Sequence, residues 1–187
     1  MRIISGKFKN KKLFFSESLT TRPLKDRVRE SIFNILEHSN ILNTQIKNAS
    51  ILDLYAGVGS FGLECISRGA KRISFVENNY HALVNLKKNI DVLKVEKQTE
   101  LYSVDIFKFF DKSQITKKFD VVFFDPPYKD QEFFKIFEII KKIDILNKKY
   151  IIILHRERNS NIDLEKKLNI ITSRIYGRSK IFFLRFF

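Results

Sequence analysis

The sequence predicts an α/β fold built on a doubly wound, mostly parallel sheet. From residue 50 onward, short apolar runs alternate with stretches in which apolar residues recur at helical spacing. Strands that alternate with helices pair in parallel through right-handed crossovers. Near the C-terminus, residues 170–176 and 180–187 flank Gly177 and predict an antiparallel strand pair.

The apolar runs are the predicted parallel strands, and the periodic stretches are the predicted crossover helices. With the C-terminal pair, the five runs give a sheet of seven strands. Each run is apolar almost throughout, as expected of a strand that is buried on both faces of a parallel sheet. The expected strands are residues 51–55, 73–76, 101–104, 121–124 and 151–154, and the expected helices are residues 60–68, 79–93, 105–111 and 131–143.

Residues 1–40 predict a small extension of the same domain. Apolar positions alternate around Gly6, which predicts a hairpin or an extended arm. Pro23 suits the first turn of a helix, and the apolar residues within 24–36 recur at helical spacing. The chain of 187 residues is therefore expected to form a single domain, with a basic hairpin and helix ahead of a sheet core at 50–187.

The composition excludes several classes of protein. No apolar run approaches the roughly 20 residues of a membrane span, and the N-terminus lacks the apolar stretch of a signal peptide. Cys65 is the single cysteine, and the three histidines are scattered without metal-ligand spacing, so neither a disulfide nor a metal site is expected. The sequence therefore predicts a cytoplasmic, metal-free protein that does not bind membranes, and a monomer is the expected state.

The formal net charge of +14 is confined to the two ends of the chain. Residues 1–30 hold nine Lys and Arg against three Asp and Glu, and residues 141–187 hold twelve against four, whereas residues 31–140 hold fourteen of each. A segregated excess of this size favours a polyanion as partner. A lysine-rich, solvated surface is the simpler alternative, and the charge does not distinguish one polyanion from another.

An acid stands at the end of each of the first four predicted strands: Asp53, Glu77, Asp105 and Asp125. Ligands of open α/β sheets bind beyond the carboxyl ends of the strands, so these acids are expected to share one edge. A single acid there would equally cap the helix that follows, and Asp105 has the strongest capping alternative. All four together predict a ligand that carries positive charge.

Residues 57–62 match the pattern GxGxxG at the turn after the first strand. Gly57 and Gly59 allow a tight turn and close approach of a ligand, and Glu77, twenty residues after Gly57, is placed to hydrogen-bond a ribose. The pattern alone equally suits an NAD-binding oxidoreductase, which stays open as an alternative. Asp53 favours another ligand, because its carboxylate would repel a pyrophosphate and attract an ammonium group. A ribose, an α-ammonium and a sulfonium centre together describe S-adenosylmethionine.

The fourth strand ends abruptly in Asp125-Pro126-Pro127-Tyr128. Two consecutive prolines remove two backbone donors and fix φ, which predicts a stiff, extended turn. The carbonyls of Asp125 and Pro126 are then expected to lack strand partners and to form a cluster of acceptors beside a carboxylate and an aromatic face. Such a cluster suits a flat base with an exocyclic amine, and the simpler interpretation is a strand end followed by a turn.

These motifs resemble the Rossmann-fold, class I methyltransferases, and more narrowly the RsmD family of bacterial enzymes. The resemblance spans nearly the whole chain, with Asn10 in place of a usual glycine and Tyr55 in place of a usual phenylalanine. Its most diagnostic part is the region of the first predicted helix. The motifs that carry the resemblance are Thr21-Arg22-Pro23, Asp26-Arg27-Val28-Arg29-Glu30, Phe33-Asn34-Ile35-Leu36, Asp53-Leu54-Tyr55-Ala56-Gly57-x-Gly59, Gly62-Leu63-Glu64, Ser67-Arg68-Gly69-Ala70, Phe75-Val76-Glu77 and the turn at Asp125.

The resemblance implies methyl transfer from S-adenosylmethionine to the N2 amine of a guanine in 16S ribosomal RNA, within an assembled or assembling small subunit. It implies that Asp125 and the carbonyl of Pro126 accept the protons of that amine, while Tyr128 stacks on a base that has left its helix. The residues expected to contact the cofactor are Asp53, Gly57, Gly59, Glu77, Asp105 and Ile106.

The basic ends of the chain are expected to hold RNA phosphates, and about half of these cations are expected only to solvate the surface. A DNA adenine-N6 methyltransferase shares the turn and the cofactor, but it normally needs extra mass to read sequence. A non-catalytic RNA-binding module would explain the charge and would leave the acids and the glycine turn unused. The candidate RNA-binding residues are Lys7, Lys9, Lys11, Lys12, Arg22, Lys25 and Arg29.

Overall fold

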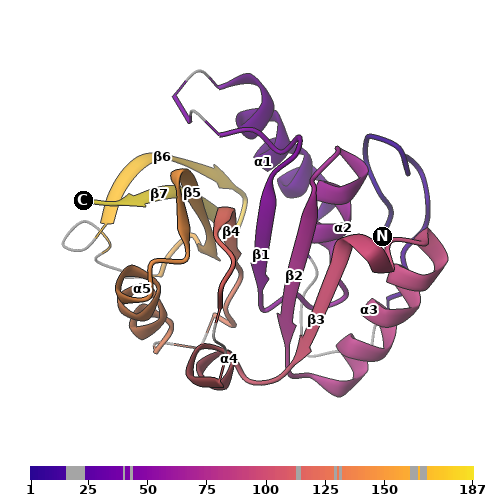
Figure 1. Ribbon diagram of the computed structural model, residues 1–187. Helices are drawn as coiled ribbons and strands as arrows, with labels where there is room; N and C mark the ends of the chain where they lie inside the picture. The colour runs from indigo at the N-terminus through magenta and orange to yellow at the C-terminus, as the bar shows by residue number, and fades with distance from the viewer. Residues whose placement is uncertain are drawn as a thin grey trace.

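The computed structural model describes residues 1–15, 24–39, 41–42, 44–112, 115–128, 130, 132–160, 164 and 168–187. The strands of its central sheet are β1 Ser50–Leu54, β2 Arg72–Glu77, β3 Thr99–Ser103, β4 Phe119–Phe124, β5 Leu146–Glu157, β6 Leu168–Tyr176 and β7 Ser179–Phe186. They lie in the order β3-β2-β1-β4-β5-β7-β6 (Figure 1). The first five strands run parallel, whereas β7 runs antiparallel to both β5 and β6. This arrangement confirms the predicted fold class.

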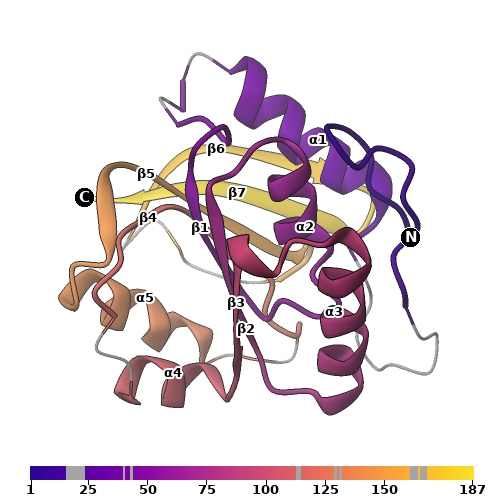
Figure 2. The same cartoon turned by 45° about the vertical axis from the view of Figure 1, so that its right-hand side comes forward.

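Helices cover both faces of the sheet. They are α1 Asp26–His38, α2 Ser60–Ser67, α3 Tyr80–Leu93, α4 Ile106–Lys112 and α5 Phe133–Lys142, with a short 3-10 helix, η1 Glu96–Gln98. The first three helices pack on one face, and α4 and α5 pack on the other (Figures 1 and 2). In β4, Val121 faces the first group and Val122 the second. Because both faces are covered, the central strands are apolar throughout.

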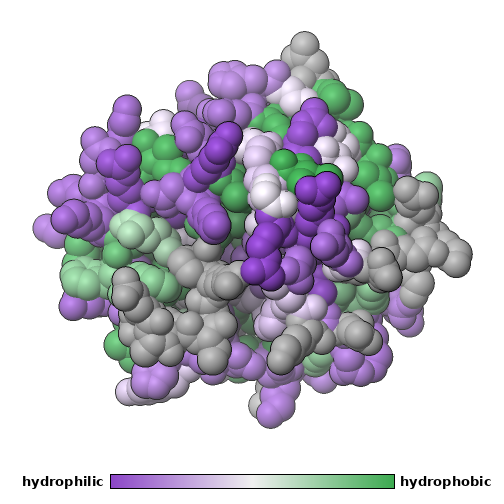
Figure 3. All heavy atoms as spheres, turned by 180° about the vertical axis from the view of Figure 1, so that it is seen from behind, coloured by the Kyte–Doolittle hydropathy of each residue, from purple (hydrophilic) through white to green (hydrophobic). Residues whose placement is uncertain are grey.

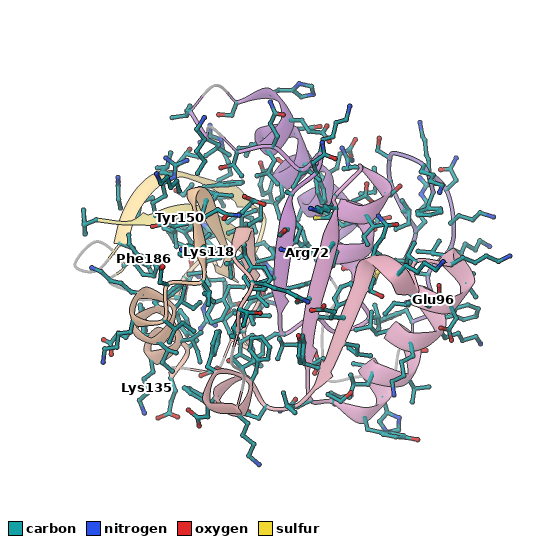
Figure 4. The ribbon with its side chains drawn as sticks, in the orientation of Figure 1. Arg72, Glu96, Lys118, Lys135, Tyr150 and Phe186 are labelled. Atoms are coloured by element: carbon teal, nitrogen blue, oxygen red, sulfur yellow. The ribbon has the colours of Figure 1, made fainter. Side chains whose placement is uncertain are left out.

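β5 is longer than its apolar run predicts, since it begins at Leu146 rather than near residue 151. Leu146 pairs with the first residue of β4, and the side chain of Asn147 donates a hydrogen bond of 2.7 Å to Asp120. On the other side, the hydroxyl of Tyr150 accepts a hydrogen bond of 2.7 Å from the backbone N–H of Phe186, and Figure 4 shows the two residues close together. Exposed lysines in this half of β5 interrupt the apolar pattern and hide the strand from sequence analysis.

The N-terminal arm, residues 1–15, is part of the core. Its side chains Ile3 and Leu13 are buried among those of α1 and α2. The backbone N–H groups of Ile4 and Ser5 donate hydrogen bonds of 2.7 and 2.9 Å to the carboxylate of Glu64, which is buried in α2. The carboxylate of Glu64 is therefore one of several groups that attach the arm to the sheet domain, together with Ser67 and Asn89.

The turn of the arm lies at the amino edge of the sheet, where the parallel strands begin. α2 starts after the carboxyl end of β1 and runs back to Ser67. The backbone N–H of Lys7 donates to the carbonyl of Ser67 at 2.8 Å, and Gly6 packs so closely there that a Cβ would lie 1.9 Å from the same oxygen. Lys7 and Lys9 are consequently at the edge opposite to the predicted site.

The prediction that Arg29 binds RNA is wrong. Its side chain in α1 is fully buried, with Asp26 at 3.0 Å and Glu64 at 3.9 Å. Burial lowers the pKa of Arg29, and the carboxylates of Glu64 and Asp26 oppose that shift. The guanidinium also donates hydrogen bonds to the carbonyls of Ser60 and Arg2. Arg29 therefore joins α1, α2 and the arm, and its burial results from packing against both α2 and the arm.

The remaining candidate RNA-binding lysines are exposed, and Arg22 lies outside the described residues. Seen from behind, the molecule presents mainly hydrophilic side chains with scattered apolar patches (Figure 3). No helix in the described part of the chain is long and apolar enough to cross a membrane. The exposed lysines of this group are Lys7, Lys9, Lys11, Lys12 and Lys25.

Replacement of Glu64 by glutamine should lower the free energy of unfolding by about 3 kcal/mol, because it removes the buried carboxylate beside Arg29 and leaves only the half-exposed carboxylate of Asp26. Urea denaturation measures this loss. The matched control is Glu37→Gln, which removes the more exposed partner of Arg68 and should cost less than about 1 kcal/mol. Equal losses in the two variants would contradict the role of Glu64.

Candidate active site

The four strand-end acids meet at the carboxyl edge of the sheet, where the parallel strands end. We call Asp53, Glu77, Asp105 and Asp125 the acid rim. β1 and β4 are paired neighbours, so Asp53 and Asp125 lie on adjacent strands. Burial raises the pKa of Asp53 well above its usual value; the hydrogen bond from Gly62 opposes this shift, and the carboxylates of Asp125 and Glu77 add to it. The structure thus places these acids on one edge, as expected.

The glycine turn faces open space at one position and packs closely at two. Gly57 has φ +56°, and a Cβ built there would meet nothing within 4 Å. Gly59 has φ +80°, and a Cβ there would lie 2.4 Å from Leu86 of α3. A Cβ at Gly62 would lie 2.3 Å from Phe75 of β2. Gly57 is therefore the position where the backbone faces open space, whereas the other two glycines allow helices and strands to approach closely.

Glu77 connects the glycine turn to the start of α3. One carboxylate oxygen accepts a hydrogen bond of 2.7 Å from the backbone N–H of Gly57. The other accepts from the backbone N–H groups of Asn78 and Asn79 at 2.9 and 2.8 Å. A carboxylate has about four acceptor sites, so acceptor capacity remains for a ligand hydroxyl. The predicted role of Glu77 at a ribose is compatible with these contacts.

A crevice of about 20 Å³ lies between the ends of β1, β2 and β3. Asp105 lines it and also caps α4, because its Oδ1 accepts a hydrogen bond of 2.9 Å from the backbone N–H of Phe107. Asp105 therefore caps α4, as the alternative interpretation predicted, and it is also a member of the acid rim. The residues around the crevice are Tyr55, Val76, Glu77, Asn78, Asp105 and Ile106.

Tyr55 links this crevice to the chain that follows β4. Its backbone has φ +58°, an uncommon conformation for a residue with a side chain. Its hydroxyl donates a hydrogen bond of 2.6 Å to Asp130. Burial raises the pKa of the phenol, and the hydrogen bond to Asp130 raises it further. The hydroxyl that distinguishes this residue from the usual phenylalanine therefore has a partner.

The carboxylate of Asp125 is held by a histidine that sequence analysis missed. Nδ1 of His155 lies 2.8 Å from Oδ1 of Asp125, and its Nε2 lies 3.4 Å from the hydroxyl of Tyr128. Phe124 and Leu154 are paired in the parallel ladder, so the residues that follow them, Asp125 and His155, lie side by side. The signal in the sequence was a polar pair, His155-Arg156, that ends an otherwise apolar run.

Arg156 holds the backbone of residues 125–128, which we call the proline turn. Its guanidinium donates to the carbonyls of Pro127 and Tyr128 at 2.9 and 2.8 Å. It donates at 3.3 Å to the carbonyl of Pro126 and at the same distance to that of Asp130. The prolines thus free these carbonyls from the ladder, and the side chain of an arginine on the next strand binds them; a carbonyl oxygen has two lone pairs, so that of Pro126 retains one.

Comparison with known proteins shows the family of this chain. The family described as conserved hypothetical protein 95 matches residues 1–185. The putative rRNA methyltransferase YlbH of Bacillus subtilis is 31% identical over 159 residues, which are 84% of this chain and 83% of that protein. The ribosomal RNA small subunit methyltransferase D of Haemophilus influenzae is 38% identical over 129 residues, which are 68% of this chain and 64% of that protein. This chain belongs to the RsmD family.

The fold extends the RsmD likeness over the whole chain. The solved structure titled putative methyltransferase yhhF from Escherichia coli superposes with a TM-score of 0.83 at 26% identity, covering 100% of this chain and 97% of that one. Membership of the RsmD family makes the chain a methyltransferase, which decides against hydride transfer. Sheets that bind dinucleotides have the strand order 3-2-1-4-5-6. Here the antiparallel β7 stands between β5 and β6 instead.

Replacement of Asp53 by asparagine should remove a pH dependence of stability. The pKa of Asp53 is higher in the folded than in the unfolded protein, so its contribution to stability falls as pH rises from about 4 toward the folded value. The slope that it adds reaches about 1.4 kcal/mol per pH unit. Urea denaturation between pH 4 and pH 8 should therefore show a flatter profile for Asp53→Asn.

The variant should also be more stable than the wild type at neutral pH, since the amide still accepts the hydrogen bond from Gly62 without burying a charge. Asp91→Asn, at an exposed position of α3, is the control and should change stability by less than about 0.5 kcal/mol. Parallel pH profiles for Asp53→Asn and the wild type would contradict the burial of a titrating carboxyl.

Proposed function

We propose that this protein transfers a methyl group from S-adenosylmethionine to the exocyclic N2 of a guanine in 16S ribosomal RNA, with the small ribosomal subunit as its substrate. The observation that carries the proposal is the proline turn, which presents a carboxylate, carbonyl oxygens and an aromatic ring directly beside the acid rim. Relatives named ribosomal RNA small subunit methyltransferase D support RNA as the substrate. As proposed, the enzyme acts as a cytoplasmic monomer.

The acid rim fits the cofactor in charge and in hydrogen-bonding groups. When bound, S-adenosylmethionine supplies an electrophilic methyl group on a positively charged sulfur. Asp53 is 1% exposed and already accepts the N–H of Gly62 at 3.0 Å, so it acts on the ammonium end through water. Glu77 binds the ribose hydroxyls, Gly57 allows backbone approach, and Asp105 with the backbone of Ile106 meets the adenine edge.

The crevice between the strand ends is far smaller than the roughly 300 Å³ or more of a small-molecule site. Its side chains must therefore move as the cofactor enters. Tyr55 is the largest of them, and its hydroxyl is tied to Asp130 rather than to the rim. Outward movement of this ring widens the crevice without disturbing the hydrogen bonds of Glu77.

The proline turn holds the reacting amine. The lone pair of a guanine N2 is delocalised into the ring, which makes this nitrogen a poor nucleophile. Asp125 and the carbonyl of Pro126 accept the two N–H groups and orient the lone pair toward the methyl group, so that positioning supplies most of the rate acceleration. Tyr128 stacks on the extruded base, an interaction worth roughly 1–3 kcal/mol. Asp125 receives the proton that becomes acidic as the new bond forms.

His155 and Arg156 position these groups from behind. Since a carboxylate only accepts hydrogen bonds, Nδ1 of His155, 2.8 Å from Oδ1 of Asp125, is the donor of this pair, which leaves Oδ2 for the amine. Arg156 fixes the carbonyls of the proline turn through its planar fork. Neither side chain needs to touch the substrate, and both restrict the turn to one geometry.

Asp125→Ala and Tyr128→Ala should each lower kcat for methylation of unmodified small subunits by about 100-fold or more, because they remove the proton acceptor and the stacking surface. Incorporation of tritiated methyl groups measures the rate, and mass spectrometry of the RNA identifies the modified atom. Calorimetric titration should give an unchanged affinity for S-adenosylmethionine. Near wild-type turnover in both folded variants would refute the chemistry.

His155→Leu should lower kcat by about tenfold or more with little change in KM, since the carboxylate of Asp125 loses the donor that orients it. His155→Asn is the matched variant, because its amide nitrogen occupies nearly the place of Nδ1 and should restore most of the rate. If both variants had the same kcat, His155 would be a packing residue only.

A further inference from the structure

A pocket of about 310 Å³ opens at the carboxyl end of β5, outside the acid rim and the proline turn. Two arginines, an acid, an amide and a glycine surround it, so its walls are mainly polar. These residues come from the end of β5 and from the turn between β6 and β7. They are Glu157, Arg158, Asn159, Gly177 and Arg178.

The strand pairing places this pocket beside the proline turn. Glu157 is the register partner of Ser179, so the turn between β6 and β7 extends beyond the carboxyl end of β5. His155, two residues before Glu157, contacts both Asp125 and Tyr128. A nucleotide stacked on Tyr128 would therefore have its neighbours near these arginines.

The pocket carries an excess of positive charge. The guanidinium of Arg178 forms an ion pair of 2.7 Å with Glu157, and its side chain is 73% exposed. The backbone N–H of Arg158 donates to the carbonyl of Arg178 at 2.8 Å, which keeps the two residues together. The exposed side chain of Arg158 makes no ion pair with any described residue. An exposed ion pair is worth about 0–1 kcal/mol, so an anion can displace Glu157 at little cost.

We propose that Arg158 and Arg178 bind the phosphate of a nucleotide that flanks the target guanine, an inference that rests on RNA as the proposed substrate. Arginine binds phosphate with two parallel N–H donors, and two arginines on one wall provide a pair of such forks. Extrusion of the target base exposes the adjoining backbone, and this pocket lies on the side of Tyr128 that leads away from the cofactor crevice.

This assignment names residues of the basic C-terminal region for the phosphate contacts that the charge of both chain ends predicts. Lys7 and Lys9 lie at the amino edge of the sheet, so they contact parts of the RNA remote from the reacting base. Arg158 and Arg178 lie at the carboxyl edge, the same edge as Asp125. Phosphate contacts set register and orientation without reading sequence, so the pocket positions the strand on which the proline turn acts.

The test is the double variant Arg158→Gln/Arg178→Gln assayed on unmodified small subunits at several salt concentrations. We expect KM to rise by about tenfold with kcat within about threefold of the wild type. The slope of log affinity against log salt should decrease by about 1, as for one lost phosphate contact. The control is Lys97→Gln in η1 at the opposite edge, which should leave KM and the slope unchanged.

Glu157→Gln provides a change of opposite sign, because it releases Arg178 from its ion pair and should lower KM by about twofold to threefold. A double variant with the KM and salt slope of the Lys97→Gln control would overturn the phosphate site. If the wild type bound S-adenosylmethionine but methylated no RNA, the proposed function would fall, and this inference with it. If the wild type methylates RNA but the double variant has the KM and salt slope of Lys97→Gln, the phosphate site is refuted and the proposed function stands.

Discussion

The arrangement of the candidate active site depends on the buried guanidinium of Arg156. Two consecutive prolines withdraw the chain after β4 from the ladder, which leaves a run of carbonyls that burial would make costly. One planar side chain from the neighbouring strand binds four of them and lies over the ring of Phe133, 4.6 Å from its centroid. Because the turn is fixed in this way, the positions of Asp125 and Tyr128 follow from the register of β4 and β5.

In the acid rim, by contrast, the carboxylates repel one another, and the free protein does not relieve this repulsion. Asp53 is buried beside two further carboxylates, and its raised pKa reflects a charged form that is costly in this place. A cationic ligand removes part of that cost. The repulsion that lowers the stability of the free protein therefore makes binding of such a ligand more favourable. Arg29 of α1 and Glu64 of α2, in contrast, form a buried ion pair. The fold thus neutralises buried charge where no ligand is expected.

The sequence predicted what local patterns determine. Apolar runs located the parallel strands, and the carboxyl-edge rule brought Asp53, Glu77 and Asp125 together. Prediction from local patterns failed where a residue's environment is determined by a partner distant in the chain. Arg29 looks like a surface cation within its own helix, and packing against α2 and the docked arm buries it. His155 and Arg156 acquire their roles from a parallel partner 30 residues away, and β5 itself is half hidden by exposed lysines.

Tyr55 connects the crevice between the strand ends to the proline turn, so the two parts of the candidate site are structurally linked. Its ring lines the crevice, its left-handed backbone shapes the entry to the glycine turn, and its hydroxyl binds Asp130. The carbonyl of Asp130 is bound in turn by Arg156, so one chain of contacts runs from the first strand to the fifth. Any displacement of Tyr55 costs its bond to Asp130 and loosens the segment that follows Tyr128. Because such coupling is reciprocal, a base that bound the proline turn as proposed would act back on the crevice through the same side chain.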